Sequence, residues 1–161
     1  MTYLQSNDNA SAATGRLRGG GCIFCDKPSE NHDAENLIVQ RGQTAYVILN
    51  LYPYNNGHLM VVPYAHVPSP EQLEAVTLTE IMALMNQGIT VLRTLYSPQA
   101  FNVGMNIGMA AGAGIAGHVH LHVVPRWAGD TNFMTVAAET RVIPEDLTTT
   151  WQRMKNAWPR M

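Results

Sequence analysis

The chain has 161 residues, of which 46% are hydrophobic and 14% are charged, and its formal net charge is −2. This length suits one domain with a substantial core, and the slightly acidic balance gives no broad basic surface for nucleic acid. No apolar run is long enough for a membrane span, and the first twenty residues lack the apolar segment of a signal peptide. We therefore expect a cytoplasmic protein with neither nucleic acid nor membrane as a partner.

The N-terminal segment combines a polar leader with a pair of cysteines. Residues 1–20 are rich in small and polar side chains, which predicts a flexible leader before a domain over residues 21–161. Cys22 and Cys25 then form a C-x-x-C pair, which is typical of half a zinc site, of a redox pair or of neither. The redox interpretation needs a βαβ context that the sequence lacks, whereas downstream histidines can complete a zinc site. His32 lies in a polar run and is expected in a solvated loop.

Three short apolar segments predict the first strands. Those at 37–41 and 44–49 flank Gly42-Gln43, and this pattern indicates a hairpin with a two-residue turn. The third segment, 58–63, begins with a histidine and ends at a proline.

Two helices are expected downstream of these strands. Thr77 to Glu80 has the pattern of a capping box, and apolar residues then recur at helical spacing until Ser97-Pro98. This stripe belongs to the core of one long central helix: Ile81, Leu84, Met85, Gly88, Leu92 and Leu95. Pro144 suits the first turn of a last helix, whose stripe is Leu147, Trp151, Met154 and Trp158.

A strand and a loop of small residues lie between the helices. Residues 101–108 alternate like a strand, and the loop at 109–117 contains Gly112 and Gly114. Such a loop lets backbone N–H groups approach a phosphate. Glycine-rich turns are common, so the loop gains interest from its place directly before the histidine-rich segment.

Histidines occupy every second position at His118, His120 and His122, within the segment 117–126. The alternation predicts a strand with three imidazoles on one face and apolar side chains on the other. Neighbouring imidazoles would begin roughly 6–7 Å apart, close enough to share a metal, a phosphate or a proton. Any half-buried strand alternates in this way, but three histidines in register are unusual because strands favour β-branched and aromatic residues.

The histidine face suits two kinds of chemistry. A neutral imidazole at pH 7 can attack phosphorus and form a covalent intermediate, and the chain has no dense carboxylate set for Mg²⁺. The same H-x-H pattern can bind a catalytic zinc in a hydrolase. Residue types alone leave both interpretations open.

The order of these features resembles the histidine triad (HIT) family of nucleotide hydrolases and transferases. The resemblance covers about residues 22 to 135 and is carried by C-x-x-C, NLYPYNNGHLMVVPYAHV, the central helix, FNVGMNIG, the glycine-rich loop and HVHLHVVPRWAGD. Within the family, the chain is most similar to the actinobacterial diadenosine tetraphosphate phosphorylase group, followed by the fragile-histidine-triad dinucleoside hydrolases. The resemblance implies an α+β, HIT-like fold with a mostly antiparallel sheet of about five strands, a central helix, a C-terminal helix and a homodimeric assembly.

The resemblance also implies the roles of individual residues. His120 would be the nucleophile that forms a nucleotidyl-histidine, while His122 and His58 would contact the phosphate. Asn50 matches the position that binds the ribose and Asn106 the position that contacts the phosphate. The glycines of the loop, Gly112 and Gly114, would complete the nucleotide site.

In the zinc-containing branch of the family, four residues hold a structural zinc, and they correspond here to Cys22, Cys25, His66 and His118. Four protein ligands complete a tetrahedron and leave no open position for catalysis. The metal would therefore link the N-terminal segment to the histidine strand without taking part in the reaction.

The expected activity is cleavage of a nucleotide phosphoanhydride, with a dinucleoside polyphosphate such as diadenosine tetraphosphate as the favoured substrate and inorganic phosphate or water as the acceptor. Three alternatives stay open at this point. They are a purine nucleoside phosphoramidate hydrolase of the same family, a zinc-dependent hydrolase, and a nucleotide-binding module without catalysis.

Overall fold

The structure, a computed structural model, describes residues 21–130 and 145–159. The leader expected over residues 1–20 lies outside this range, as does Pro144.

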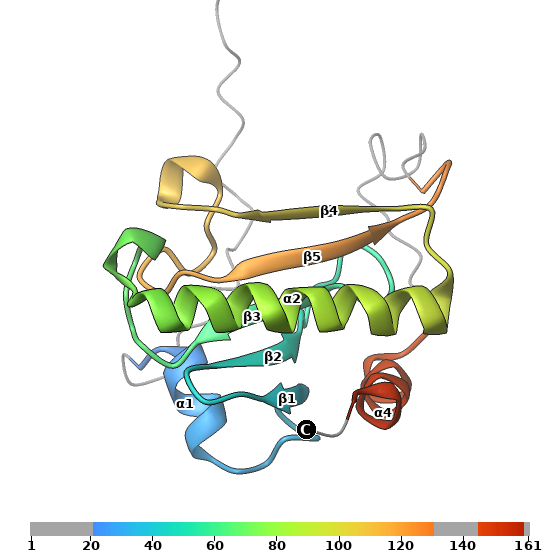
Figure 1. The fold of residues 1–161 in the computed structure, drawn as a ribbon, viewed down its shortest axis with the longest axis horizontal. Helices are drawn as coiled ribbons and strands as arrows, with labels where there is room; N and C mark the ends of the chain where they lie inside the picture. The colour runs from blue at the N-terminus through green and yellow to red at the C-terminus, as the bar shows by residue number, and fades with distance from the viewer. Residues whose placement is uncertain (1–20, 131–144, 160–161) are drawn as a thin grey trace, which may run out of the picture.

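One antiparallel sheet has the strand order β1-β2-β3-β5-β4 (Figure 1). Its strands are β1 (Ile38–Arg41), β2 (Ala45–Leu49), β3 (Leu59–Pro63), β4 (Ala100–Met105) and β5 (Leu121–Arg126). The helices are α1 (Ile23–Ser29), α2 (Ala75–Tyr96) and α4 (Leu147–Ala157), with short 3₁₀ turns at Pro70–Gln72 and Met109–Ala111. The expected α+β fold is confirmed.

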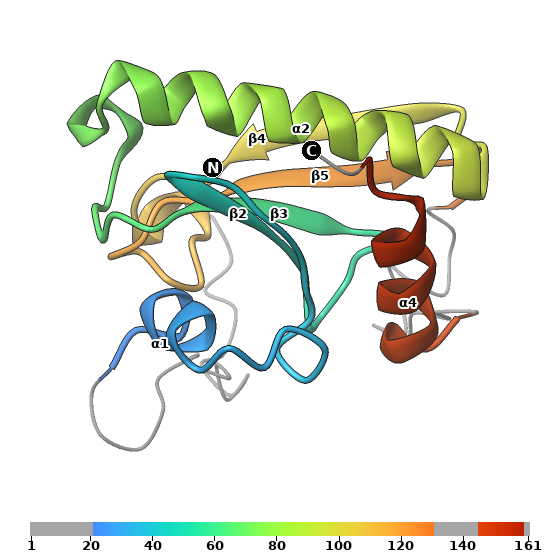
Figure 2. The same ribbon diagram turned by 60° about the horizontal axis from the view of Figure 1, so that its bottom comes forward.

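The sheet has one face covered by α2 and an opposite face turned toward α1 (Figure 2). Gly88 allows α2 to approach closely, since a Cβ there would lie 3.1 Å from Leu59 Cδ2. Side chains alternate along a strand, so Met60 faces away from α2. Ile48 and His122 pair directly with Met60 on the neighbouring strands and share its face. This face, between the sheet and α1, can therefore hold a ligand site.

α2 is the core helix that the sequence predicted. The expectation that no segment is long and apolar enough for a membrane span is wrong by this measure, because α2, alone among the helices that the structure describes, has that length and composition, as a core helix can. The helix packs against β2, β3 and β5, and its buried positions are Thr77, Ile81, Leu84, Met85, Gly88, Val91 and Leu92. The helix ends as expected, with Ser97 in the left-handed conformation at a φ of 46° and Pro98 after it.

The predicted capping box is wrong. α2 begins at Ala75, and its N-cap residue Glu74 makes no side-chain cap hydrogen bond. The Glu80 carboxylate instead accepts hydrogen bonds from the backbone N–H groups of Gln43, Thr44 and Ala45, at 2.8, 2.5 and 3.0 Å. Its partner is thus a turn more than thirty residues earlier in the chain, which local sequence spacing could not indicate.

The turn that Glu80 binds connects β1 to β2 and is longer than expected. It spans residues 42–44, so three residues separate the strands where the pattern predicted two. Gly42 is required there, because a Cβ would lie 2.6 Å from a carboxylate oxygen of Glu80 and 2.8 Å from the carbonyl oxygen of Ala45. The Glu80 carboxylate can lie against this turn because Gly42 has no side chain, and it accepts hydrogen bonds from the backbone N–H groups there.

We expect Glu80→Ala to lower the free energy of unfolding by roughly 2–3 kcal/mol, because it leaves backbone donors of the hairpin turn unpaired. Urea denaturation followed by circular dichroism measures this change. Glu74→Ala is the matched control, since Glu74 is an acidic residue on the same helix without a side-chain cap bond. Equal stability of the two variants would show that the contact to the turn contributes nothing.

The histidine-rich segment is only partly a strand. β5 begins at Leu121, so His118 and His120 precede it, and the backbone N–H of Val119 donates to the carbonyl oxygen of Val67 at 2.8 Å rather than to a neighbouring strand. β4 likewise ends at Met105, short of the predicted residue 108. His118 and His120 therefore lie in an extended segment just before β5, which is hydrogen-bonded to Val67 instead of to a strand of the sheet.

α4 begins at Leu147, where the Asp146 side chain caps it by accepting from the backbone N–H of Thr149 at 3.0 Å. The predicted apolar stripe is confirmed at Met154 and Trp158, which are buried. The helix contacts α2 and β1 and so closes the side of the core.

Candidate active site

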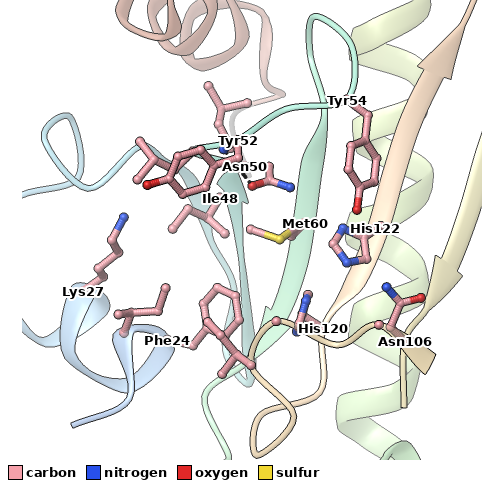
Figure 3. Close-up of a pocket in the computed structure, with 16 residues that line it drawn as sticks. Phe24, Lys27, Ile48, Asn50, Tyr52, Tyr54, Met60, Asn106, His120 and His122 are labelled. Atoms are coloured by element: carbon pink, nitrogen blue, oxygen red, sulfur yellow. Dashed lines mark hydrogen bonds between the residues drawn. The ribbon is translucent and has the colours of Figure 1, made fainter. Parts of the chain in front are cut away.

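A cavity of about 470 Å³ lies between α1, the sheet and the glycine-rich loop (Figure 3). This volume falls within the range of small-molecule sites. One part of its wall is apolar and comes from α1, β2, β3 and the loop: Ile23, Phe24, Ile48, Met60 and Ile115. The remaining wall carries polar groups that include Lys27, Asn50, Tyr52, Tyr54, Asn106, His120 and His122. The cavity thus joins an apolar slot to a cluster of imidazole and amide groups.

The structure brings most of the predicted site residues to this one cavity. Six of them line it: His120, His122, Asn50, Asn106, Gly112 and Gly114. His58 is buried directly behind the wall, with its ring centroid 5.1 Å from that of His122. Residues separated by more than seventy positions in the sequence therefore meet at one site.

His120 lines the cavity, and a hydrogen bond from its Nδ1 determines which of its two ring nitrogens carries the proton. Its Nδ1 lies 2.9 Å from the carbonyl oxygen of His118. A carbonyl oxygen only accepts, so Nδ1 carries the proton and Nε2 keeps its lone pair. Burial lowers the pKa of His120, more than the bond to the His118 carbonyl raises it. The imidazole is therefore neutral and its Nε2 is available as a nucleophile.

A chain of hydrogen bonds fixes the protons of the other two imidazoles. The backbone N–H of Tyr54 donates to His58 Nδ1 at 3.1 Å, so the proton of His58 lies on Nε2. His58 Nε2 lies 2.9 Å from His122 Nδ1 and donates to it. His122 then carries its own proton on Nε2. Burial, with a smaller contribution from repulsion when His120 is protonated, lowers the pKa of His122 to about 4, so this group is a neutral hydrogen-bond donor.

His118 belongs to a second cluster, outside the cavity. The ligand atoms of Cys22, Cys25, His66 and His118 all lie within 4.8 Å of one another. His118 Nδ1 lies 3.3 Å from Cys22 Sγ and 3.2 Å from His66 Nδ1, and Cys25 Sγ lies 3.4 Å from His66 Nδ1. Bond lengths to zinc of about 2.0–2.3 Å give tetrahedral edges of roughly 3.3–3.8 Å. The four donors therefore fit a zinc ion closely.

The chemistry of the four donors also fits a cation. Burial and the neighbouring Cys22 raise the pKa of the Cys25 thiol to about 11, so two thiolates would not stand side by side without a positive charge between them. His118 Nε2 donates to the carbonyl oxygen of Pro63 at 2.8 Å, which directs Nδ1 at the cluster. A zinc bound here would have four protein ligands, consistent with a structural role.

The family model of the HIT domain matches residues 31–129, more than half of the chain. The chain belongs to the HIT family. It is 47% identical over 128 residues to the AP-4-A phosphorylase of Mycobacterium tuberculosis, a match that covers 80% of this chain and 66% of that protein. It therefore spans slightly less than two thirds of that relative's length. It is also 30% identical over 93 residues to the asymmetrical bis(5′-nucleosyl)-tetraphosphatase of Schizosaccharomyces pombe, covering 58% of this chain and 50% of that one.

Solved structures of HIT proteins share the fold. A zinc-bound histidine triad family protein from Mycobacterium smegmatis superposes with a TM-score of 0.69 at 27% identity, covering 85% of this chain and 92% of that one. The predicted family membership and HIT-like fold are thus confirmed. The zinc in that neighbour agrees with the donor set of Cys22, Cys25, His66 and His118.

Among the cavity-lining residues to which the sequence assigned no role, four carry aromatic or charged side chains: Phe24, Lys27, Tyr52 and Tyr54. Phe24 and Lys27 come from α1, a helix of seven residues that contains Pro28 and is too short for a periodic pattern. Phe24 packs against His120 with ring centroids 4.9 Å apart. Tyr52 and Tyr54 lie in the YPY part of a motif that the sequence did show. The signal that could have marked them is their place in the motif, because both tyrosines lie within six positions of His58.

Proposed function

We propose that this HIT protein cleaves a phosphoanhydride bond of a dinucleoside polyphosphate through a nucleotidyl-histidine at His120. Diadenosine tetraphosphate is the favoured substrate, because the relative at 47% identity is named AP-4-A phosphorylase. The observation that supports this proposal most directly is the 2.9 Å contact between His120 Nδ1 and the carbonyl oxygen of His118. This contact holds Nδ1, so the lone pair on Nε2 is available in the cavity.

The proposed reaction has two steps. His120 Nε2 attacks the α-phosphorus, the N–P bond forms, and the P–O bond breaks so that its electron pair leaves with the nucleoside polyphosphate. The His122 Nε2–H stabilises the negative charge on the leaving oxygen by donating a hydrogen bond. Water or inorganic phosphate then attacks the same phosphorus and releases His120. The carbonyl oxygen of His118 stabilises the charged ring of the intermediate through Nδ1–H.

The remaining wall residues suit the other parts of a nucleotide. We assign the base to the apolar slot beside Phe24 and Ile48, which can cover a planar aromatic ring. We assign the ribose to Asn50, whose Oδ1 accepts from the backbone N–H of Tyr52 at 3.0 Å and so fixes the amide. We assign the phosphate oxygens to Asn106 and to the loop that contains Gly112 and Gly114, because the backbone of this loop offers N–H donors.

The test is incubation with diadenosine tetraphosphate, with and without inorganic phosphate, followed by chromatography of the products. ATP together with ADP, formed only when phosphate is present, identifies a phosphorylase, which is the outcome we expect. ATP together with AMP identifies a hydrolase. Binding of AMP without turnover of any dinucleoside polyphosphate or phosphoramidate would overturn the proposal in favour of a binding module.

The homodimer that the resemblance implies and the cytoplasmic location expected from the composition stay predictions. In support of a dimer, β4 is an edge strand of the described sheet, and Val103 on it is 43% exposed. An edge strand with exposed apolar side chains is a surface that can pair with a second chain.

A further inference from the structure

We propose that Asn55 and Asp130 form a bridge that positions the loop over residues 52–57 and thereby sets the tautomers of His58 and His122. This inference rests on the proposed function, since it assigns the loop a part in preparing the donor to the leaving group. It makes Asn55 a positioning residue, which acts on the reaction through Tyr54 and His58.

The loop touches His58 from several sides. The backbone N–H of Tyr54 donates to His58 Nδ1, and the carbonyl oxygen of Asn55 accepts from the backbone N–H of His58 at 3.1 Å. The Tyr54 ring also lies over the imidazole with its centroid 4.8 Å away. Figure 3 shows the phenol end of Tyr54 directed toward His122. The loop therefore supplies the shortest hydrogen bond to His58 Nδ1, since the other donor near this atom, Asn50 Nδ2, lies 3.4 Å away, and the loop favours a proton on Nε2.

Burial holds the loop over 52–57 only at Pro53 and Gly57. Its side chains Tyr52 and Tyr54 are 66% and 50% exposed, and Leu51 beside it is 51% exposed. Segments with little buried apolar surface open at low cost in free energy. Polar contacts must therefore contribute much of the order of the loop.

The bridge supplies such contacts at the centre of the loop. Asn55 Nδ2 donates to Asp130 Oδ2 at 2.7 Å and to the carbonyl oxygen of Pro125 at 2.9 Å. Asp130 is itself fixed by Arg126, whose Nε and Nη2 lie 2.6 Å from its two carboxylate oxygens. The backbone N–H of Trp127 also donates to Asp130 at 3.1 Å. The loop is thereby joined to the end of β5, a rigid part of the sheet.

Loss of the bridge would remove the shorter of the two hydrogen bonds to His58 Nδ1 and allow the direction of the hydrogen bonds to reverse in part of the molecules. If the N–H of Tyr54 moves away, His58 can carry its proton on Nδ1, and its Nε2 then becomes an acceptor. His122 would have to donate from Nδ1 and would present a lone pair on Nε2 to the cavity. That lone pair would face an anionic leaving oxygen and repel it. The bridge thus favours the protonation state that assists bond cleavage.

The test is Asn55→Ala in the full-length chain, with two measurements. We expect kcat for diadenosine tetraphosphate to fall roughly 10- to 100-fold, and by a clearly larger factor than KM rises, because the base slot comes from α1 and β2 while the loop touches the binding wall only through Tyr52, Tyr54 and the Asn50 amide. Nitrogen-15 NMR of histidine-labelled protein should show His58 protonated at Nε2 in the wild type and a mixture of tautomers in the variant. Asp33→Asn is the matched control: it weakens an Asp–Arg pair of similar length, 2.7 Å to Arg41, away from the cavity, and should change neither measurement.

The two measurements separate the bridge from a general structural role and from the proposed function. A variant with wild-type kcat and an unchanged His58 spectrum would overturn the proposal. So would lower activity and a lower melting temperature with unchanged tautomers, since that result indicates loss of stability alone. If the wild type cleaves no nucleotide, the proposed function fails, and the NMR comparison still decides whether Asn55 sets the tautomer.

Discussion

His120→Asn is expected to lower kcat for cleavage of diadenosine tetraphosphate by at least about 10⁴-fold, because removal of a nucleophile abolishes the covalent route. Binding of AMP should persist, since the base slot and Asn50 do not depend on the imidazole. The amide of asparagine is close in size to the lost ring and can still donate to the His118 carbonyl. The expected loss is therefore chemical rather than structural.

Two measurements check this expectation. Acid-free quenching of a reaction with substrate labelled at the α-phosphorus should trap label on the wild-type protein and none on the variant. Calorimetric titration with AMP should give similar affinities for both proteins. His32→Asn is the control, because His32 is an exposed histidine that does not line the cavity. Wild-type turnover by the His120 variant would remove this residue from its proposed role.

Cys22→Ser should lower the melting temperature by roughly 10 °C, because loss of one of four zinc ligands removes several kcal/mol of metal-linked stability. The four ligands join the start of α1 to His66 after β3 and to His118 beside the cavity. The stabilisation therefore couples segments that are nearly one hundred residues apart. Activity at low temperature should fall much less than stability.

Differential scanning calorimetry and metal analysis check this prediction together. The wild type should contain about one zinc per chain, and the variant should contain less. The His32→Asn protein serves again as the control, since His32 is a histidine outside the cluster. Chelation should lower the melting temperature in the same way while turnover continues wherever the protein stays folded. Loss of turnover from folded, metal-free protein would favour a catalytic zinc, and an unchanged metal content in Cys22→Ser would exclude this residue as a ligand.

Long periodic elements could be predicted from the sequence, and local motifs at their ends could not. The apolar stripe from Ile81 to Leu92 identified α2 because burial of one face requires that spacing. The capping box at Thr77 and Glu80 failed, because a carboxylate binds whichever donors lie nearest in space. For Glu80 these donors are the N–H groups of a hairpin turn. The same limit applies to α1, whose seven residues hold no repeated pattern.

The sequence by itself determined which chemical groups the site contains: three histidines at alternate positions, a fourth at His58, and a C-x-x-C pair with a further histidine at position 66. The alternating pattern placed all three histidines on one face, whereas the family resemblance implied a division that the tertiary structure shows, with His118 in the metal cluster and His120 and His122 in the cavity. Only the tertiary structure decided the position of each proton. The physical reason is that spacing fixes the face on which a side chain lies, whereas the direction of a hydrogen bond depends on its partner. Here the partners are the carbonyl of Pro63 for His118 and the N–H of Tyr54 for His58, and folding alone brings the first of these pairs together from 55 residues apart.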